Sequence, residues 1–235
     1  MKNLINIPKM EGISSRQAHA DLPNGTFERE MSKEGFFGPS AHIYHRNPPT
    51  GWIDWDGPLR PRAFNLNKLS QNVDCPWNSV ELLFNENCRI AMWRASKSMK
   101  HLVRNADGDQ LLFIHSGTGE LYSDFGRFEI IAGDYVLLPR GTMWRLQFKS
   151  PIDILLIEST NAGFSLPDKG IAGTHAFFDP AMLDTPLIDK KFLDQQTAVG
   201  VTERWQVRIK RKNNISTVTY PYNPLDAVGW HGSLM

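Results

Sequence analysis

Short apolar stretches separated by turn residues fill the chain from about residue 86 to residue 160. The turn signals recur about every eight to twelve residues, which leaves no room for helices of ordinary length. Within RIAMWR, Ile90 and Met92 alternate with Ala91 and Trp93. Alternation with a period of two is typical of half-buried antiparallel strands. We therefore predict an all-β fold whose core is an antiparallel β-barrel or β-sandwich.

Changes in composition divide the chain into three parts. Residues 1–85 are dense in Pro, Gly, Asn and Trp, and their closely spaced prolines exclude long helices and central strands, so we predict an irregular arm. Residues 86–160 form the predicted core. Residues 161–235 are predicted to form a connecting segment and further strands, because apolar and polar residues alternate within ERWQVRIKR. Only two short helical patterns stand out, at 178–184 and 189–198.

Charge, hydropathy and cysteine content argue against several classes of protein. The formal net charge is +1, and the one basic run, RIKRKNN, is typical of a solvated hairpin rather than of a nucleic-acid surface. The apolar runs are too short to span a bilayer, and the N-terminus lacks the apolar stretch of an export signal. We therefore predict a cytoplasmic protein that contacts neither membrane nor nucleic acid. Cys75 and Cys88 are then expected to be reduced thiols.

Glycine and proline mark the turns of the predicted core at an informative spacing. Gly117 precedes a hairpin, and Gly133 is followed after five residues by Pro139, then by one residue and Gly141. This spacing resembles the two motifs of the cupin barrels, in which a metal-binding histidine lies three residues after the last glycine. Trp144 stands at that position, and an indole nitrogen donates hydrogen bonds but cannot ligate a metal.

The strand before Gly117 lacks the other metal ligands as well. A cupin site needs two histidines and a carboxylate there, but the chain offers Arg104, Asn105, Ala106 and Gln110. We therefore predict a cupin-like core that keeps the scaffold turns, binds no metal and is filled by Trp144 where the metal would lie.

Three segments, taken in order, resemble one enzyme family. Residues 105–146 are similar to a segment of the homogentisate 1,2-dioxygenase family that carries Asn-x-Asp-Gly-Asp, a Phe-Gly hairpin and an Arg-Gly turn. Residues 165–180 resemble its Leu-Pro-Asp segment, and residues 220–232 resemble its Trp-His-Gly segment. The N-terminal arm departs from the family, because the usual Tyr-Ala-Glu-Gln-Leu-Ser-Gly signature is missing. The resemblance therefore covers about residues 100–235 and leaves the arm outside it.

The resemblance implies a two-barrel dioxygenase of tyrosine and phenylalanine catabolism that opens an aromatic ring with O₂. The family holds Fe²⁺ with two histidines and one glutamate, a ligand set that leaves positions open for substrate and O₂. Those ligands lie in the later, C-terminal barrel, so the resemblance implies that this chain is the N-terminal part of such an enzyme. It would then carry no catalytic residue and no metal ligand, and would be inactive alone. The implied partners are a small aromatic acid and further copies of the chain in a trimer-based assembly.

One alternative reading of the same residues assigns no enzyme activity. In this alternative, the chain is a metal-free cupin that acts as a binding or structural module. Trp144 and neighbouring aromatic side chains then fill the space that a metal would occupy.

The histidines offer one candidate for substrate contact. His231 lies in the family-like Trp-His-Gly segment and either faces the space between barrels or has a hydrogen-bonded structural role. His42 and His45 would share a face only in a helix, and in an extended segment their spacing sends them to opposite faces, so surface or packed roles are expected. The remaining histidines considered are expected to be structural or solvated: His101, His115 and His175.

Two tryptophans in the arm lie beside carboxylates. Trp52 and Trp55 alternate with Asp54 and Asp56, a combination that suits stacking on a sugar or an aromatic ring. We favour instead an arm that docks these aromatic side chains onto a partner subunit.

Overall fold

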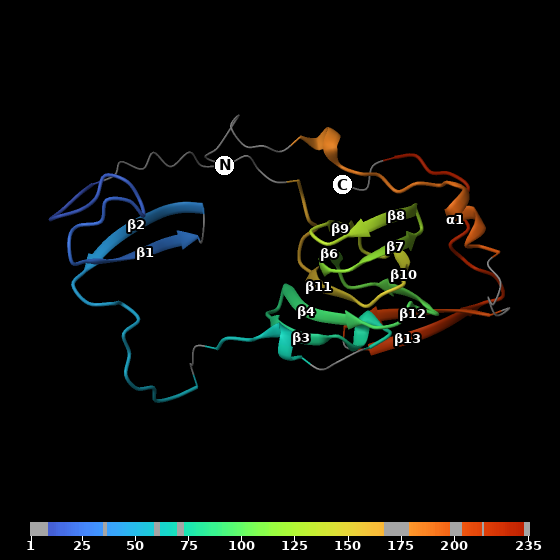
Figure 1. Ribbon diagram of the computed structural model, residues 1–235, viewed down its shortest axis with the longest axis horizontal. Helices are drawn as coiled ribbons and strands as arrows, with labels where there is room; N and C mark the ends of the chain where they lie inside the picture. The colour runs from blue at the N-terminus through green and yellow to red at the C-terminus, as the bar shows by residue number, and fades with distance from the viewer. Residues whose placement is uncertain are drawn as a thin grey trace. The chain divides into compact units, whose positions relative to one another are not determined.

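The computed structural model describes residues 9–34, 37–58, 62–69, 73–166, 179–197, 204–212 and 214–232 (Figure 1). It comprises two compact units, Met1–Phe64 and Asn65–Met235. The three-part division expected from the sequence, with boundaries after residues 85 and 160, stays a prediction.

The first unit is built on one antiparallel hairpin. Strand β1 (Phe27–Glu34) pairs with β2 (Phe37–His45), so that Phe27 lies opposite His45 and Glu30 lies opposite His42. Residues 46–58, which include Pro48, Pro49 and Pro58, form neither helix nor strand. None of the described residues of this unit is buried. The described residues of this unit therefore form no apolar core. An isolated two-stranded hairpin without such a core is marginally stable in water.

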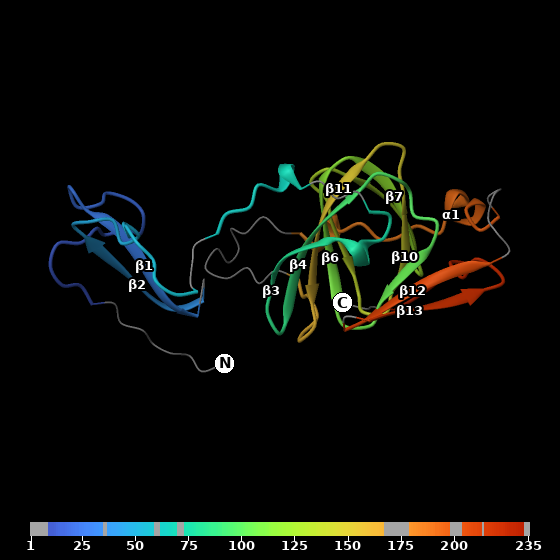
Figure 2. The same ribbon diagram turned by 90° about the horizontal axis from the view of Figure 1, so that it is seen from below.

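The second unit consists of two sheets, shown face to face in Figures 1 and 2. One has six strands in the order β13-β12-β5-β10-β7-β8, and the other has five in the order β3-β4-β11-β6-β9. Every pair is antiparallel except β5 and β12, which run parallel. The strands are β3 (Val80–Phe84), β4 (Cys88–Ala95), β5 (Leu102–Asn105), β6 (Asp109–Ser116), β7 (Thr118–Ser123), β8 (Gly126–Ile131), β9 (Tyr135–Leu138), β10 (Met143–Gln147), β11 (Ile152–Ser159), β12 (Trp205–Arg211) and β13 (Asn214–Tyr220).

This architecture confirms the predicted fold class, a cupin-like antiparallel sandwich with an N-terminal arm and a strand-rich C-terminal extension. The two sheets stay separate, so the core is a sandwich and not a closed barrel. Helical structure among the described residues is short: η1 (Leu66–Lys68), η2 (Pro76–Asn78), η4 (Pro180–Met182) and α1 (Lys190–Asp194). No helix in these parts of the chain is both long enough and apolar enough to cross a membrane.

The main core lies between the sheets. Strand β11 alternates buried and half-buried residues along its whole length, as expected for a strand with one face on a core. The six-stranded sheet contributes Trp144 and Leu146, and the five-stranded sheet contributes Trp93 and Ile154. All four side chains are fully buried. Cys75 joins the same core, and neither it nor Cys88 forms a disulfide.

A second core covers the outer face of the six-stranded sheet. Phe192 of α1 packs there with Trp205 and Val207 of β12, Tyr122 of β7 and Leu225. The alternation seen in ERWQVRIKR therefore serves this outer core, and the C-terminal extension is an integral part of the sandwich.

Two of the predicted scaffold turns place glycine in left-handed backbone. Gly133 has φ of 101° and Gly141 has φ of 89°, a region that side chains disfavour. The backbone N–H of Thr142 donates to the carbonyl oxygen of Pro139 at 3.1 Å, which closes the second turn. Gly117 also has positive φ. The role of these residues as a cupin scaffold stays a prediction.

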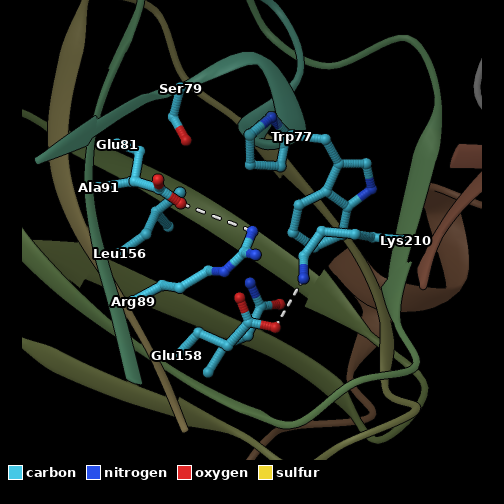
Figure 3. A pocket seen from close by; sticks show the side chains of 10 residues that line it. Trp77, Ser79, Glu81, Arg89, Ala91, Leu156, Glu158 and Lys210 are labelled. Atoms are coloured by element: carbon cyan, nitrogen blue, oxygen red, sulfur yellow. Dashed lines mark hydrogen bonds and ion pairs between the residues drawn. The ribbon is translucent and has the colours of Figure 1, made fainter. Parts of the chain in front are cut away.

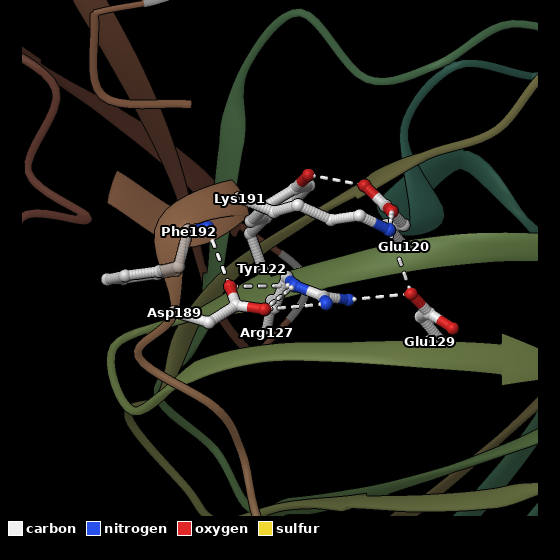
Figure 4. A network of polar contacts seen from close by, with 7 residues as sticks. All are labelled: Glu120, Tyr122, Arg127, Glu129, Asp189, Lys191 and Phe192. Atoms are coloured by element: carbon white, nitrogen blue, oxygen red, sulfur yellow. Dashed lines mark hydrogen bonds and ion pairs between the residues drawn. The ribbon is translucent and has the colours of Figure 1, made fainter. Parts of the chain in front are cut away.

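A polar network fixes α1 to strand β8, as Figure 4 shows. Arg127 donates to Asp189 from Nε at 2.9 Å and from Nη2 at 2.7 Å, and the Phe192 backbone N–H donates to Asp189 Oδ1 at 3.0 Å. Asp189 is thus both an ion-pair partner and the N-cap of α1. The hydrogen bonds from Arg127, followed by the one from Phe192, lower the pKa of Asp189 to about 2.

Replacing Asp189 with alanine is expected to lower the free energy of unfolding by about 2 kcal/mol, combining the lost cap with a partly screened ion pair. Screening limits the effect because 36% of the Asp189 side chain is exposed. Urea unfolding at pH 7 measures it. Asp194→Ala is the matched control, since the exposed Lys190–Asp194 pair should contribute at most about 0.5 kcal/mol. Equal losses in both variants would contradict the assigned role of Asp189.

Candidate functional site

Trp144, which stands at the position of the cupin metal-binding histidine, lies in the interior of the sandwich. Its side chain is 0% exposed, and its ring meets Trp93 edge to face with the centroids 6.0 Å apart. The indole Nε1 donates to Gln110 Oε1 across a long contact of 3.4 Å. The space between the two sheets is filled here by two large aromatic rings.

Two of the other four positions considered as metal ligands carry buried amide groups that are hydrogen-bonded. Asn105 and Gln110 are buried, whereas Arg104 is half-buried and Ala106 is exposed. Asn105 donates through Nδ2 to Glu158 Oε1 at 2.8 Å. Gln110 bonds Trp144, as described above. The side-chain amides of Asn105 and Gln110 are therefore both hydrogen-bonded to neighbouring side chains.

Lys210 of β12 joins this network from the strand next to β5, which carries Asn105. Its Nζ donates to Glu158 Oε1 at 2.7 Å and to Asp107 Oδ2 at 2.8 Å. Although burial acts against ionisation, the hydrogen bonds from Lys210 and from the Lys212 backbone lower the pKa of Asp107. The ammonium group thus bridges two carboxylates and ties the β5–β6 turn to β11 and β12.

A cavity of about 100 Å³ opens beside this network (Figure 3). Two ion pairs contribute to its wall: Lys210 with Glu158, and Arg89 with Glu81 at 3.5 Å. The full lining is Pro76, Trp77, Ser79, Glu81, Arg89, Ala91, Gln110, Leu156, Glu158 and Lys210. Because its charged groups neutralise one another, the cavity suits water or a small polar molecule.

The cavity does not fit an iron ion. An Fe(II) site of the dioxygenase type needs two imidazoles and a carboxylate that converge on one point. The lining contains no histidine, and its innermost carboxylate, Glu158, already accepts from Asn105 and Lys210. The described residues that line this cavity therefore contribute packing and ion pairs, and the absence of a metal from the chain stays a prediction.

None of the described histidines of the second unit lines this cavity. His231 is exposed beside Trp230, whose ring meets Phe125 edge to face at 6.1 Å. Its contact with substrate stays a prediction. His101 is buried, His115 is exposed, and His175 lies outside the described residues.

The tryptophans of the arm are exposed and touch each other. Trp52 is 56% exposed and Trp55 is 43% exposed, with their ring centroids 6.1 Å apart. Docking of these rings onto a partner subunit stays a prediction.

One polar cluster was not predicted from the sequence. His19, which adopts an uncommon φ of 62°, lies with Glu28 and Glu30 of β1 and His42 of β2. The sequence around His19 gives no sign of this cluster, because the turn that brings His19 onto the hairpin follows no regular pattern.

Comparison with known proteins gives a consistent picture. The family model described as homogentisate 1,2-dioxygenase N-terminal matches residues 76–235, more than half of the chain. A protein of Saccharolobus solfataricus named as a dioxygenase is 28% identical over 231 residues, which cover 91% of this chain and 58% of that protein. The homogentisate 1,2-dioxygenase of Sinorhizobium fredii is 30% identical over 132 residues, which cover 55% of this chain and 27% of that enzyme. The chain therefore spans only part of the length of these relatives.

Solved structures give a weaker match. A cupin-2 domain protein from Shewanella frigidimarina is 17% identical, with a TM-score of 0.35 over 41% of this chain and 93% of its own. A TM-score at this level carries no weight for function.

Proposed function

The chain belongs to the homogentisate 1,2-dioxygenase N-terminal family, and from this membership we propose that it is the N-terminal part of an Fe(II)-dependent dioxygenase that opens an aromatic ring. The family match over residues 76–235 is the observation that carries the proposal. The resemblance found in the sequence and the two dioxygenase relatives support it. The proposed substrate is a small aromatic acid of the homogentisate type.

In this proposal the iron ligands lie outside the chain. Support comes from the cavity beside Trp144, whose residues do not fit an iron ion, and from relatives that are considerably longer than the matched segment. When bound elsewhere, iron would supply the activation of O₂ and of the ring. The sandwich would act as a folded support for that centre. His231 is the one residue here that we propose to face the substrate.

Oxygen consumption with homogentisate tests the proposal. We expect no uptake by the 235-residue chain after reconstitution with Fe²⁺ under reducing conditions. We expect uptake, with about one iron per chain, in the product of the complete reading frame that contains it. Uptake by the chain alone would refute the placement of the iron ligands, and the absence of uptake from the longer product would refute the dioxygenase assignment.

The alternative of a metal-free binding module draws on the polar cavity. A molecule bound there would contact Lys210 and Glu158, so Lys210→Met should abolish binding of any small polar ligand to the chain alone. In the proposed enzyme the same change only weakens the fold, because it removes the partner of two carboxylates. Saturable binding that disappears in Lys210→Met, combined with no oxygen uptake by the longer product, would favour the module.

A further inference from the structure

Four side chains with metal-binding groups converge on one face of the β1–β2 hairpin. Glu28 and Glu30 are two residues apart on β1 and therefore share a face. His42 lies opposite Glu30 in the register, and His19 reaches the same face from the segment before β1. The His19 and His42 rings meet edge to face at 5.3 Å.

The distances within this cluster are close to those of a ligand set. One ligand atom from each of His19, Glu30 and His42 lies within 4.8 Å of the others. His19 Nε2 and Glu30 Oε2 are 3.6 Å apart. Two ligands of a tetrahedral Zn²⁺ ion, with bonds of about 2.0 to 2.1 Å, lie about 3.4 Å apart. Small side-chain rotations would therefore bring all three atoms to bonding distance of one ion.

Glu28 occupies the place of an orienting group behind the two histidines. Its Oε2 lies 3.0 Å from His19 Nδ1, and its Oε1 lies 2.8 Å from His42 Nδ1. Metal-bound histidines commonly donate their second ring N–H to a carboxylate in this way, which leaves Nε2 for the metal. The contact to His42 lacks the alignment of a hydrogen bond, so its buried Nδ1 has no proper partner until the ring turns. Only 7% of the Glu28 side chain is exposed, whereas His19 is 66% exposed and gives access from solvent.

The first unit also has a structural need for a cross-link. None of its described residues is buried, and small units without an apolar core are commonly held by a metal or a disulfide. An ion bound to His19, Glu30 and His42 would join the N-terminal segment to both strands. It would also neutralise the two neighbouring carboxylates.

We propose that His19, Glu30 and His42 bind one divalent transition-metal ion of the zinc class, with Glu28 orienting both imidazoles. Two imidazoles and a carboxylate suit Zn²⁺, with water as the fourth ligand. The site is structural: it pins residues 15–20 onto the hairpin. It is independent of the proposed dioxygenase activity, and it departs from the surface or packed role expected for His42 from the sequence.

Isothermal titration of the EDTA-treated full chain with Zn²⁺ alone tests the site. We expect one equivalent to bind, with Kd in the micromolar range or below. His42→Ala and Glu30→Gln should each weaken binding by about 100-fold or more. Glu28→Gln should weaken it by about 10-fold to 100-fold, as for other orienting groups. Co²⁺ substitution should give the visible absorption of a four-coordinate site in the wild type and lose it in His42→Ala.

His45→Ala is the matched control, because His45 is on the same strand and outside the cluster. We expect its Zn²⁺ affinity to stay within about twofold of the wild type. Equal weakening by His45→Ala and His42→Ala, or no stoichiometric binding up to 100 µM free Zn²⁺, would overturn the proposal. Far-UV circular dichroism checks that every variant keeps the sandwich, and the near-isosteric Glu30→Gln keeps the test valid if His42→Ala disturbs the hairpin.

Discussion

Replacing Trp144 with alanine is expected to lower the free energy of unfolding by about 3 to 5 kcal/mol, the usual loss for an aromatic side chain removed from a core. The indole is fully buried between the two sheets and packs against Trp93, so its removal leaves a cavity that the flanking strands cannot close. It also leaves Gln110 Oε1 without its donor. Urea unfolding followed by far-UV circular dichroism measures the loss without relying on tryptophan fluorescence.

The control for this experiment is Trp52→Ala, in a side chain that is 56% exposed. Substitutions at such surface positions usually change stability by no more than about 0.5 kcal/mol. A loss below about 1 kcal/mol in Trp144→Ala would show that the indole lines open space and fills no core. Trp144→His should create no metal site, because Asn105 and Gln110 supply amide groups where further imidazoles would be needed.

Acidification from pH 6.5 to pH 4 is expected to remove up to about 3 kcal/mol of stability through His101 alone. Burial, reinforced by the charge of Arg208 and opposed by that of Asp74, lowers the pKa of His101 to about 4. Its Nε2 is buried without a hydrogen-bond partner. In the unfolded chain the imidazole takes up a proton near pH 6.5, whereas in the folded chain it stays neutral until about pH 4. The contribution is therefore complete above pH 6.5 and is lost as the pH falls to 4.

His101→Gln separates the loss of stability that His101 causes on acidification from the loss that the carboxylates cause, because the carboxylates are the same in every variant. Urea unfolding at pH 7.5 and at pH 4.5 should show a smaller difference in stability for His101→Gln than for the wild type. His115→Gln changes an exposed histidine and should follow the wild type. If all three proteins lost the same stability, His101 would not be the group that senses acid in this range.

The sequence was informative where a residue type answers a local geometric demand. Alternation of apolar and polar residues predicted the strands because one face of each strand meets a core, as β11 shows. Glycine marked the reversals because Gly133 and Gly141 adopt left-handed backbone. Trp144 stood out because an indole cannot replace an imidazole as a ligand.

The sequence was uninformative where the outcome depends on contacts between distant segments. The proline-rich composition of residues 1–85 suggested an arm without regular structure. Residues 27–45 nevertheless form a hairpin, because most prolines of the arm lie after β2. Nothing in the local pattern around His101 indicates burial, since the side chain is covered with help from β12, about a hundred residues away. The His19 cluster likewise depends on a turn with positive φ at a residue other than glycine.

The parallel pairing of β12 with β5 bears on the order in which the protein folds during synthesis. Val207 lies opposite Leu102, so this ladder joins residues about one hundred positions apart in the chain. Such non-local pairings form late because the intervening chain must first be made and its loop closed. Strand β5 therefore keeps an unpaired edge while the ribosome adds the next hundred residues, and β12 covers that edge only when it emerges. Until then the unpaired edge of β5 can pair with strands of other chains. We therefore expect chaperones to bind the nascent chain during this interval.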